Sequence, residues 1–414
     1  MMKIEDNKEE FMTIYPRPEI TKPKKGTILE ISMLVNYPLS CLNRDRSGTP
    51  KSLNFGGVNR AAISSQCQKR AIREALAERC PSTGLRTRRA PAIIRDLLLD
   101  MGVKEDLAKV GMQMVAAKFG YNTEDEELTN QNIAFNDNEL TVMAELIKEM
   151  FESEGLSASA ARKKFLKTEK GKDGKEKKNP KLVPTSDFKT QFKPIKKKAE
   201  EAPNTLGLAL SGRMDATKTF DNIEGSWSIG FAFGTNPFVI TSDFFTALDD
   251  LDKENGAAMM GDTDYTSACF YVHVVLDVNQ LEDNLAGYED VQGFIKEFIP
   301  VFIETVVTTN PTAKKHSTDS AQRPSAVLVE VKDSVCSYAN AFVSPIKSGN
   351  LIQTSVERLA EECDSSQAVW GIGCRKRVWL APAVNDNEKV SLNCAKNVNT
   401  LKELLAEFDD IYAL

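Results

Sequence analysis

The stretch of sequence that decides the fold is residues 27–76, which read TILEISMLV, then NYPLSCLNRDRSGTPKSLNFGGVNRAA, then ISSQCQKRAIREAL. In residues 27–35 every second side chain is apolar, which predicts a strand covered on at least one face. Residues 36–62 are rich in Asn, Arg, Gly and Pro, and a loop of this length is too long to be a simple connector. The stretch therefore predicts a core strand followed by a loop rich in cations.

A basic helix is predicted after this loop. It begins at Ser64 or Ser65, because Ser65 and Gln68 have the spacing of a capping box. At about 100° per residue, one face of the helix is apolar and the other collects three cations and an amide. The polar face consists of Gln66, Lys69, Arg70 and Arg73. Such a face beside the free N–H groups of the first turn fits a row of phosphates, although a solvated surface helix has the same pattern.

The preceding loop favours the phosphate interpretation, because it supplies four more cations. They are Arg44, Arg46, Lys51 and Arg60. The pair Gly56-Gly57 would also permit a close backbone approach.

The net charge of −6 over 414 residues hides a strong segregation of charge. Residues 44–89 contain 11 basic and 3 acidic residues, and residues 162–198 contain 15 basic and 4 acidic residues. A chain divided in this way can present basic tracks to nucleic acid although its overall charge is negative. The centre of the second stretch, residues 167–181, has no apolar face, so we expect a mobile loop there.

Beyond these stretches, helical and strand-like patterns alternate. Strands are predicted at residues 205–214, 227–233, 269–278 and 326–331. Helices are predicted at residues 90–107, 140–151, 291–307, 355–363 and 400–408. One strand, a helix, a large helical insertion and then mixed strands and helices suit an α+β domain with a ferredoxin-like core.

Membrane and secreted classes do not fit the sequence. It contains no run of 18 apolar residues, and its first ten residues are polar and acidic, unlike a signal peptide. The eight cysteines form no C-x-x-C pair, which argues against a zinc site and against a disulfide scaffold. We therefore expect a cytoplasmic protein with reduced cysteines and no contact with a membrane.

Candidates for catalysis are few. The two histidines are His273, which alternates on a predicted strand and is expected to be packed, and His316, which follows Lys314 and Lys315 and suits a phosphate contact. Walker, H-E-x-x-H and calcium-loop motifs are missing from the sequence. The sequence therefore predicts a binding protein rather than an enzyme, with no metal and no cofactor.

Several motifs follow one another between about residues 28 and 342. They are CLNRD (41–45), FGG (55–57), ISSQ (63–66), KRA (69–71), GRM (212–214), DFFTALDDL (243–251), SACFY (267–271), PTAK (311–314) and ANAF (339–342). In these motifs and in their order the chain resembles the CasC family, the repeated backbone subunit of the type I-E CRISPR Cascade complex.

The resemblance implies a hand-shaped α+β protein. Its RRM-like (ferredoxin-like) palm would take residues 25–89, 204–233 and 268–414, its helical fingers insertion residues 90–203 with a lysine-rich loop at 162–198, and its thumb hairpin residues 234–267. Copies of such a protein polymerise along the guide RNA (crRNA) and present it to target DNA in antiviral defence. The implied partners are crRNA, target DNA, further copies of the chain, and the large, small, guide-processing endonuclease and capping subunits of Cascade.

The basic patterning and the resemblance together suggest a set of site residues. Those expected to bind RNA are Asn43, Arg44, Arg46, Lys51, Arg60, Ser64, Ser65, Gln66, Lys69, Arg70, Arg73, Arg213, Met214, Lys314, Lys315 and His316. The thumb candidates are Phe244, Phe245, Met259 and Met260. Because Phe244 and Phe245 stand at helical spacing from Leu248 and Leu251, an ordinary core position is an alternative for them.

Three alternatives remain open. Related backbone subunits that target RNA use an aspartate in the corresponding loop to cleave it, which makes Asp45 a candidate catalyst; an ion pair with Arg44 or Arg46 is the structural alternative. The lysine-rich loop could contact target DNA or simply be solvated. A protein that binds cellular mRNA is a third possibility, but the aromatic RNP sequence is missing.

The family also usually carries arginines where this chain has Asn59 and Ala62.

Overall fold

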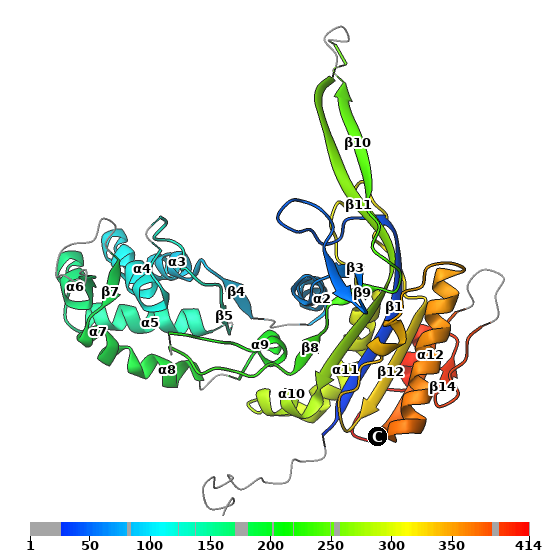
Figure 1. Cartoon of the computed structure of the whole chain (residues 1–414). Helices are drawn as coiled ribbons and strands as arrows, with labels where there is room; N and C mark the ends of the chain where they lie inside the picture. The colour runs from blue at the N-terminus through cyan, green and yellow to red at the C-terminus, as the bar shows by residue number, and fades with distance from the viewer. Residues whose placement is uncertain are drawn as a thin grey trace, which may run out of the picture.

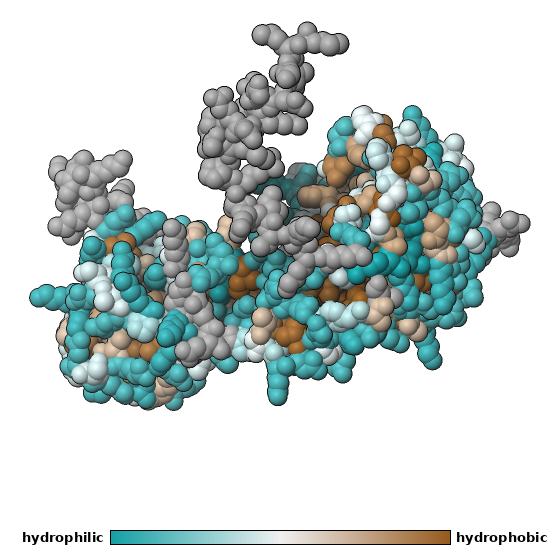
Figure 2. All heavy atoms as spheres, turned by 90° about the horizontal axis from the view of Figure 1, so that it is seen from below, coloured by the Kyte–Doolittle hydropathy of each residue, from teal (hydrophilic) through white to brown (hydrophobic). Residues whose placement is uncertain are grey.

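A computed structural model describes residues 26–80, 84–122, 124–136, 138–169, 181–200, 203–217, 219–248, 250–251, 257–382 and 389–413. A large sheet with helices on both faces forms one part, which we call the sheet domain (Figure 1). A group of helices beside it forms the helical domain, and a long hairpin stands out from the sheet (Figure 1). From below, the two domains form two mainly hydrophilic lobes (Figure 2). The α+β class predicted from the sequence is confirmed.

The sheet is built on β1 (Ile28–Ser40), which contains the predicted strand. It pairs antiparallel with β11 (Ala257–Asp277) on one side and with β12 (Ala326–Lys332) on the other. The order of the sheet is β14 (Lys396–Val398), β13 (Cys374–Leu380), β12, β1, β11, β9 (Ala232–Gly234), β3 (Val58–Ile63) and β2 (Ser52–Phe55), while β8 (Trp227–Ile229) and β10 (Thr241–Leu248) pair with β11. The first eight residues of β1 are all buried, so both faces of this strand are covered.

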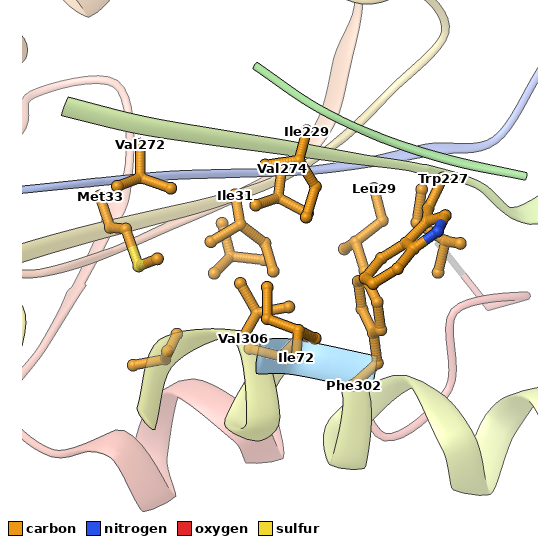
Figure 3. Packing of buried hydrophobic residues seen from close by; sticks show 14 of the residues in the cluster. Leu29, Ile31, Met33, Ile72, Trp227, Ile229, Val272, Val274, Phe302 and Val306 are labelled. Atoms are coloured by element: carbon orange, nitrogen blue, oxygen red, sulfur yellow. The ribbon is translucent and has the colours of Figure 1, made fainter. Parts of the chain in front are cut away.

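Helices cover the two faces of the sheet. On one face lie α2 (Ser65–Arg79) and α11 (Val291–Thr308), whose Ile72, Phe302 and Val306 pack beneath the strands (Figure 3). On the other face lie the short helix η1 (Ala339–Phe342) and α12 (Leu351–Trp370), which contribute to a second apolar cluster. The remaining helices of this domain are α9 (Leu206–Ser211), α10 (Val278–Asn284) and α13 (Leu401–Ala406).

The prediction of one long loop over residues 36–62 is largely wrong. The strand β1 continues to Ser40, and β2 and β3 form a hairpin, which leaves only the turn region 41–51. Gly56 and Gly57 are the tip of this hairpin, with φ of +61° and +77°, a combination that glycine adopts readily. The close approach that the glycine pair allows is made within the chain, because a Cβ on Gly56 would lie 1.9 Å from the carbonyl oxygen of Val343.

Several secondary-structure predictions need correction. Residues 205–214, predicted as a strand, contain helix α9, because a short buried apolar run has no periodicity that separates helix from strand. Residues 90–107 form two helices, α3 (Ala90–Asp100) and the start of α4 (Glu105–Phe119). Gly102, with φ of +82°, closes the first of them, since its N–H donates to the carbonyl of Leu99. Residues 227–233, predicted as one strand, form two, β8 and β9. The strand predicted at 269–278 and the helix predicted at 355–363 exist but are longer, as β11 and α12, and the remaining predicted elements are confirmed within a few residues at their ends.

The helical domain has its own apolar core, rich in phenylalanine. Its elements are α3, α4, β4 (Leu85–Thr87), β5 (Ile133–Phe135), α5 (Glu139–Glu152), α6 (Ala158–Phe165), β6 (Leu166–Thr168), β7 (Leu182–Pro184), α7 (Ser186–Gln191) and α8 (Lys193–Glu200). The lysine-rich stretch at 162–198 is therefore not one loop, because its two ends form strands and helices. Mobility was predicted for its centre, residues 167–181: Lys167 and Thr168 belong to β6, and residues 170–180 lie outside the described residues.

The long hairpin consists of β10 and the first part of β11, with Phe244 opposite Asp262 and Phe245 opposite Gly261. Phe244, Met259 and Met260 are each more than 60% exposed, and Phe245 is 37% exposed. The alternative that these phenylalanines belong to a core is therefore wrong. A free-standing hairpin has no interior, and the helical spacing in this segment is a coincidence of sequence.

Candidate nucleic-acid interface

The basic helix α2 is capped by Ser64 rather than Ser65. The hydroxyl oxygen of Ser64 accepts a hydrogen bond from the backbone N–H of Cys67 at 3.4 Å. Gln68 does not complete a capping box, because its amide is buried and donates to the carbonyls of Ile63 and Gly230. The outer face still carries the expected polar set: Gln66 and Arg70 are exposed, and Lys69 and Arg73 are half-buried.

A third cation, Arg86 on β4, lies close to Lys69 and Arg73. It was not among the residues expected to bind RNA. Burial, and then the charge of Arg86, lowers the pKa of both the Lys69 ammonium and the Arg73 guanidinium. The Lys69 ammonium donates to the carbonyl of Trp227 at 3.1 Å and lies 5.5 Å from the centre of its ring. The signal for Arg86 was its place in the basic stretch 44–89, but only the fold brings β4 beside α2.

Within the described part of the chain none of these three cations forms an ion pair, although the charge of the neighbouring Glu74 partly opposes the lowering of the Arg73 pKa. Arg70, by contrast, pairs with Glu74 at 2.7 Å, which raises its pKa. Arg73 and Arg86 line one small hollow, together with Ser211. Like charges held together without a counter-ion are unfavourable, so this cluster is a site where an anion would be stabilised.

The cations continue from α2 towards the base of the hairpin. Burial raises the pKa of the Cys67 thiol, and the nearby charges of Lys51 and Arg70 oppose that rise. Cys67 also donates to the carbonyl of Leu42, at the start of the turn region. In the same way, Arg44 and Lys314 both lie near enough to Cys41 to oppose the rise in its pKa. A basic track therefore runs from Arg86 along α2 to the turn region and the loop of Lys314.

The turn region is organised by Asn43 and Asp45. The side-chain oxygen of Asn43 accepts from the N–H of Ser64 at 3.0 Å, which ties the turn to the start of α2. Oδ1 of Asp45 accepts from the N–H and the hydroxyl of Ser47 and from the N–H of Thr49, and these bonds lower the pKa of the carboxyl group. The expected ion pair with the flanking arginines is wrong, because no pair joins Asp45 to another described residue. Arg44 and Arg46 are exposed.

Arg60, which we expected on an exposed loop, is buried instead. The side chain is fully buried, and burial lowers its pKa. Its guanidinium donates to four backbone carbonyls, those of Gly234, Thr235, Phe342 and Val343, at 2.9–3.1 Å. Arg60 therefore joins three distant segments of the sheet domain.

Arg213, also expected to face RNA, is buried as well. Its guanidinium donates to both carboxylate oxygens of Glu139 at 2.8 Å, and both side chains are buried. Burial raises the pKa of Glu139 despite this pairing. The pair links the end of α9 to α5 and so connects the two domains. The next residue, Met214, is 85% exposed and remains free for a ligand.

The remaining candidates lie around residues 314–316. Lys315 and His316 are exposed, whereas Lys314 donates to the hydroxyl of Thr263 on the hairpin at 3.1 Å. The other histidine, His273, is packed as expected, with its ring stacked on Tyr271. Among the described residues, no group of three His, Cys, Asp or Glu side chains is arranged to hold a metal ion.

The fold of the chain is similar to that of two solved chains, both described as parts of CRISPR surveillance complexes. A chain described as "CRISPR RNA-guided surveillance complex, pre-nicking" has a TM-score of 0.71 at 23% identity, and one described as "CRISPR RNA-guided surveillance complex" has a TM-score of 0.62 at 19% identity. Each match covers 92% of this chain and 100% of the other. The model of the CT1975-like protein family matches residues 29–407, so this chain belongs to that family.

A search of curated proteins found no match. Within the described residues, no helix is both long and apolar enough to span a bilayer.

Proposed function

We propose that this chain is the crRNA-binding backbone subunit of a type I-E CRISPR Cascade complex. Its copies polymerise along the guide RNA in the cytoplasm and present the guide for pairing with target DNA. Its further partners are the large, small, guide-processing endonuclease and capping subunits of that complex. The chain works as a scaffold and not as an enzyme.

The observation that carries this proposal is the crowded, unpaired cation cluster of Lys69, Arg73 and Arg86. Lys69 and Arg73 are half-buried, and none of the three cations forms an ion pair within the described residues. Such a cluster lowers the free energy of a bound polyanion more than scattered surface lysines do, because two of its cations are already partly desolvated and held in place. The basic track that continues to Arg44 and Lys314 has the extended form that a phosphate backbone needs. The exposed side chains of Met214 and of the hairpin add apolar surface against which bases can stack.

The hand-shaped division fits this role. In it the palm is residues 25–89, 204–233 and 268–414, with α2 and α11 on one face of an RRM-like (ferredoxin-like) sheet. The fingers are residues 90–203, and the thumb is residues 234–267. The described cations at the two ends of residues 162–198 belong to the fingers, and we assign the lysine-rich segment to target DNA. Its central part, residues 170–180, lies outside the described structure.

The test is whether the number of protein copies in one particle increases with the length of the RNA. The chain would be mixed with a short and a long single-stranded RNA, and the particles would be weighed by native mass spectrometry. Copies bound along the phosphate backbone should increase in proportion to the length of the RNA. One copy on both RNAs would rule out the backbone role while leaving RNA binding intact.

The role of Asp45 distinguishes a scaffold from a nuclease. Its carboxylate already accepts three hydrogen bonds from Ser47 and Thr49, which leaves it poorly suited to act as a base. Guide-loaded particles of the parent and of Asp45→Ala should both leave a complementary target RNA intact on a denaturing gel. Cleavage by the parent that disappears in Asp45→Ala would make the chain an RNA-guided nuclease.

A further inference from the structure

The base of the long hairpin is held by a carboxylate that joins three segments. Asp264 on β11 accepts a hydrogen bond from the hydroxyl of Ser242 on β10 at 2.6 Å. Its other oxygen accepts from the hydroxyl of Thr49 in the turn region at 3.0 Å. Thr49 and Asp264 are 215 residues apart in sequence. One side chain therefore connects both strands of the hairpin to the turn that carries Arg44 and Arg46.

The position of the Thr49 hydroxyl is set by Asp45. Oδ1 of Asp45 accepts from the N–H of Ser47 at 2.9 Å and from the N–H of Thr49 at 3.1 Å. The backbone N–H of Asp45 donates to the carbonyl of Thr49 at 2.9 Å, which closes the turn from the other side. An aspartate bonded to the backbone after it is a recognised way to order a tight turn. Asp45 thus holds Thr49 where it can reach Asp264.

A second contact reaches the hairpin from the Lys314 loop. The ammonium of Lys314 donates to the hydroxyl of Thr263 at 3.1 Å and lies 5.1 Å from the centre of the Tyr265 ring. Lys314 has a φ of +51°, a left-handed conformation that costs free energy for a residue with a side chain. The hairpin is therefore held by side chains from two separate loops, both of which belong to the basic track.

The charge of the hairpin explains why it needs holding from its base. Between residues 241 and 264, the described part carries Asp243, Asp250, Asp262 and Asp264 and no basic residue. Such a hairpin is repelled by phosphates, so nucleic acid does not direct it by charge. At roughly 3.3 Å per residue the eight residues of β10 span about 25 Å, and a small rotation at the base moves the tip by several ångströms.

We propose that Asp264, supported by the Asp45 turn, is a positioning residue that fixes the direction of the long hairpin. It makes the exposed apolar side chains of the hairpin and the cations of the turn region one rigid surface. The aspartate at position 45 serves this support and not cleavage. The rigidity is a property of the free chain; its use in placing the hairpin against guide RNA rests on the proposed function.

The test measures the direction of the hairpin without RNA. Spin labels would be attached to genetically encoded azide-bearing residues at Asp250 near the hairpin tip and at Lys347 on the sheet domain, both exposed, which avoids the native cysteines. Double electron–electron resonance would give the distribution of distances. The parent should show one narrow distribution, and Asp264→Ala should roughly double its width, because the bonds at the hairpin base are lost.

Two further variants test whether the hydrogen bonds of Asp264, rather than the loss of a carboxylate, fix the direction of the hairpin. Thr49→Val keeps the shape but removes the hydroxyl, so it should broaden the distribution too. Asp262→Ala removes an exposed carboxylate from the same strand and should leave the distribution narrow. Equal widths for the parent and Asp264→Ala, or a broad parent, would overturn the proposal. RNA affinity would be measured separately: a parent that fails to bind RNA but has a narrow hairpin contradicts the proposed function alone.

Discussion

Replacing Arg73 and Arg86 together by Ala should weaken the binding of single-stranded RNA roughly 25-fold at about 0.1 M salt. Each cation that neutralises one phosphate contributes about −0.7 to the log–log salt slope, which corresponds to roughly fivefold in affinity at that salt. The two side chains line the same hollow and neither forms an ion pair among the described residues, so both can contact phosphate. Fluorescence anisotropy across a salt series would measure the affinity and the slope.

The matched control for this double variant is Lys402→Ala. Lys402 is an exposed residue of α13, outside the basic track, and its loss changes the net charge in the same direction. The control should keep the parent's salt slope, while the double variant should lose about 1.4 from its magnitude. An unchanged slope in the Arg73 and Arg86 variant would remove α2 and β4 from the binding surface.

Replacing Arg213 by Ala should destabilise the fold by about 3–5 kcal/mol. The change leaves the carboxylate of Glu139 buried without its partner, and an uncompensated buried charge is costly. The guanidinium also lies 4.7 Å from the ring of Phe220, a contact that is lost as well. Urea denaturation followed by circular dichroism would give the change in the free energy of unfolding.

Two comparisons separate this structural role from RNA binding. The double variant Arg213→Met with Glu139→Gln removes both charges and should recover about half of the lost stability. Met214→Ala changes the exposed neighbour and should stay within about 0.5 kcal/mol of the parent. If Arg213→Ala kept its stability and lost RNA affinity, the residue would belong to the binding surface after all.

Elements with a clear periodicity could be predicted from the sequence. The strand at residues 27–35 and the helices α2, α11 and α12 follow from apolar side chains that recur at the spacing of one face. The outer face of α2 was predicted in the same way, with Lys69 and Arg73 on it. Periodicity did not reveal α9, because six residues are too few to show a period. It also misled at the hairpin, where two phenylalanines have helical spacing by chance.

The cations show where local pattern stops being informative. Arg60 and Arg213 stand in basic or motif-bearing stretches just as Arg44 and Arg73 do, and nothing near them in sequence distinguishes them. Arg60 bonds to carbonyls 174 to 283 residues away, and Arg213 bonds to a carboxylate 74 residues away. Whether an arginine is exposed to a ligand or buried in the fold depends on such distant partners.

By itself, then, the amino-acid sequence determined the α+β class, the central strand, the basic helix and the segregation of charge, because each depends on neighbours within a few turns of chain. Only the tertiary structure decided which cations form the site. In the folded chain Arg86 lies beside the cations of α2, whereas Arg60 and Arg213 are buried. The hydroxyl of Thr49 bonds to Asp264 at the base of the hairpin. Those outcomes depend on contacts between residues far apart in the chain, and the packing of the sheet and helices brings them together.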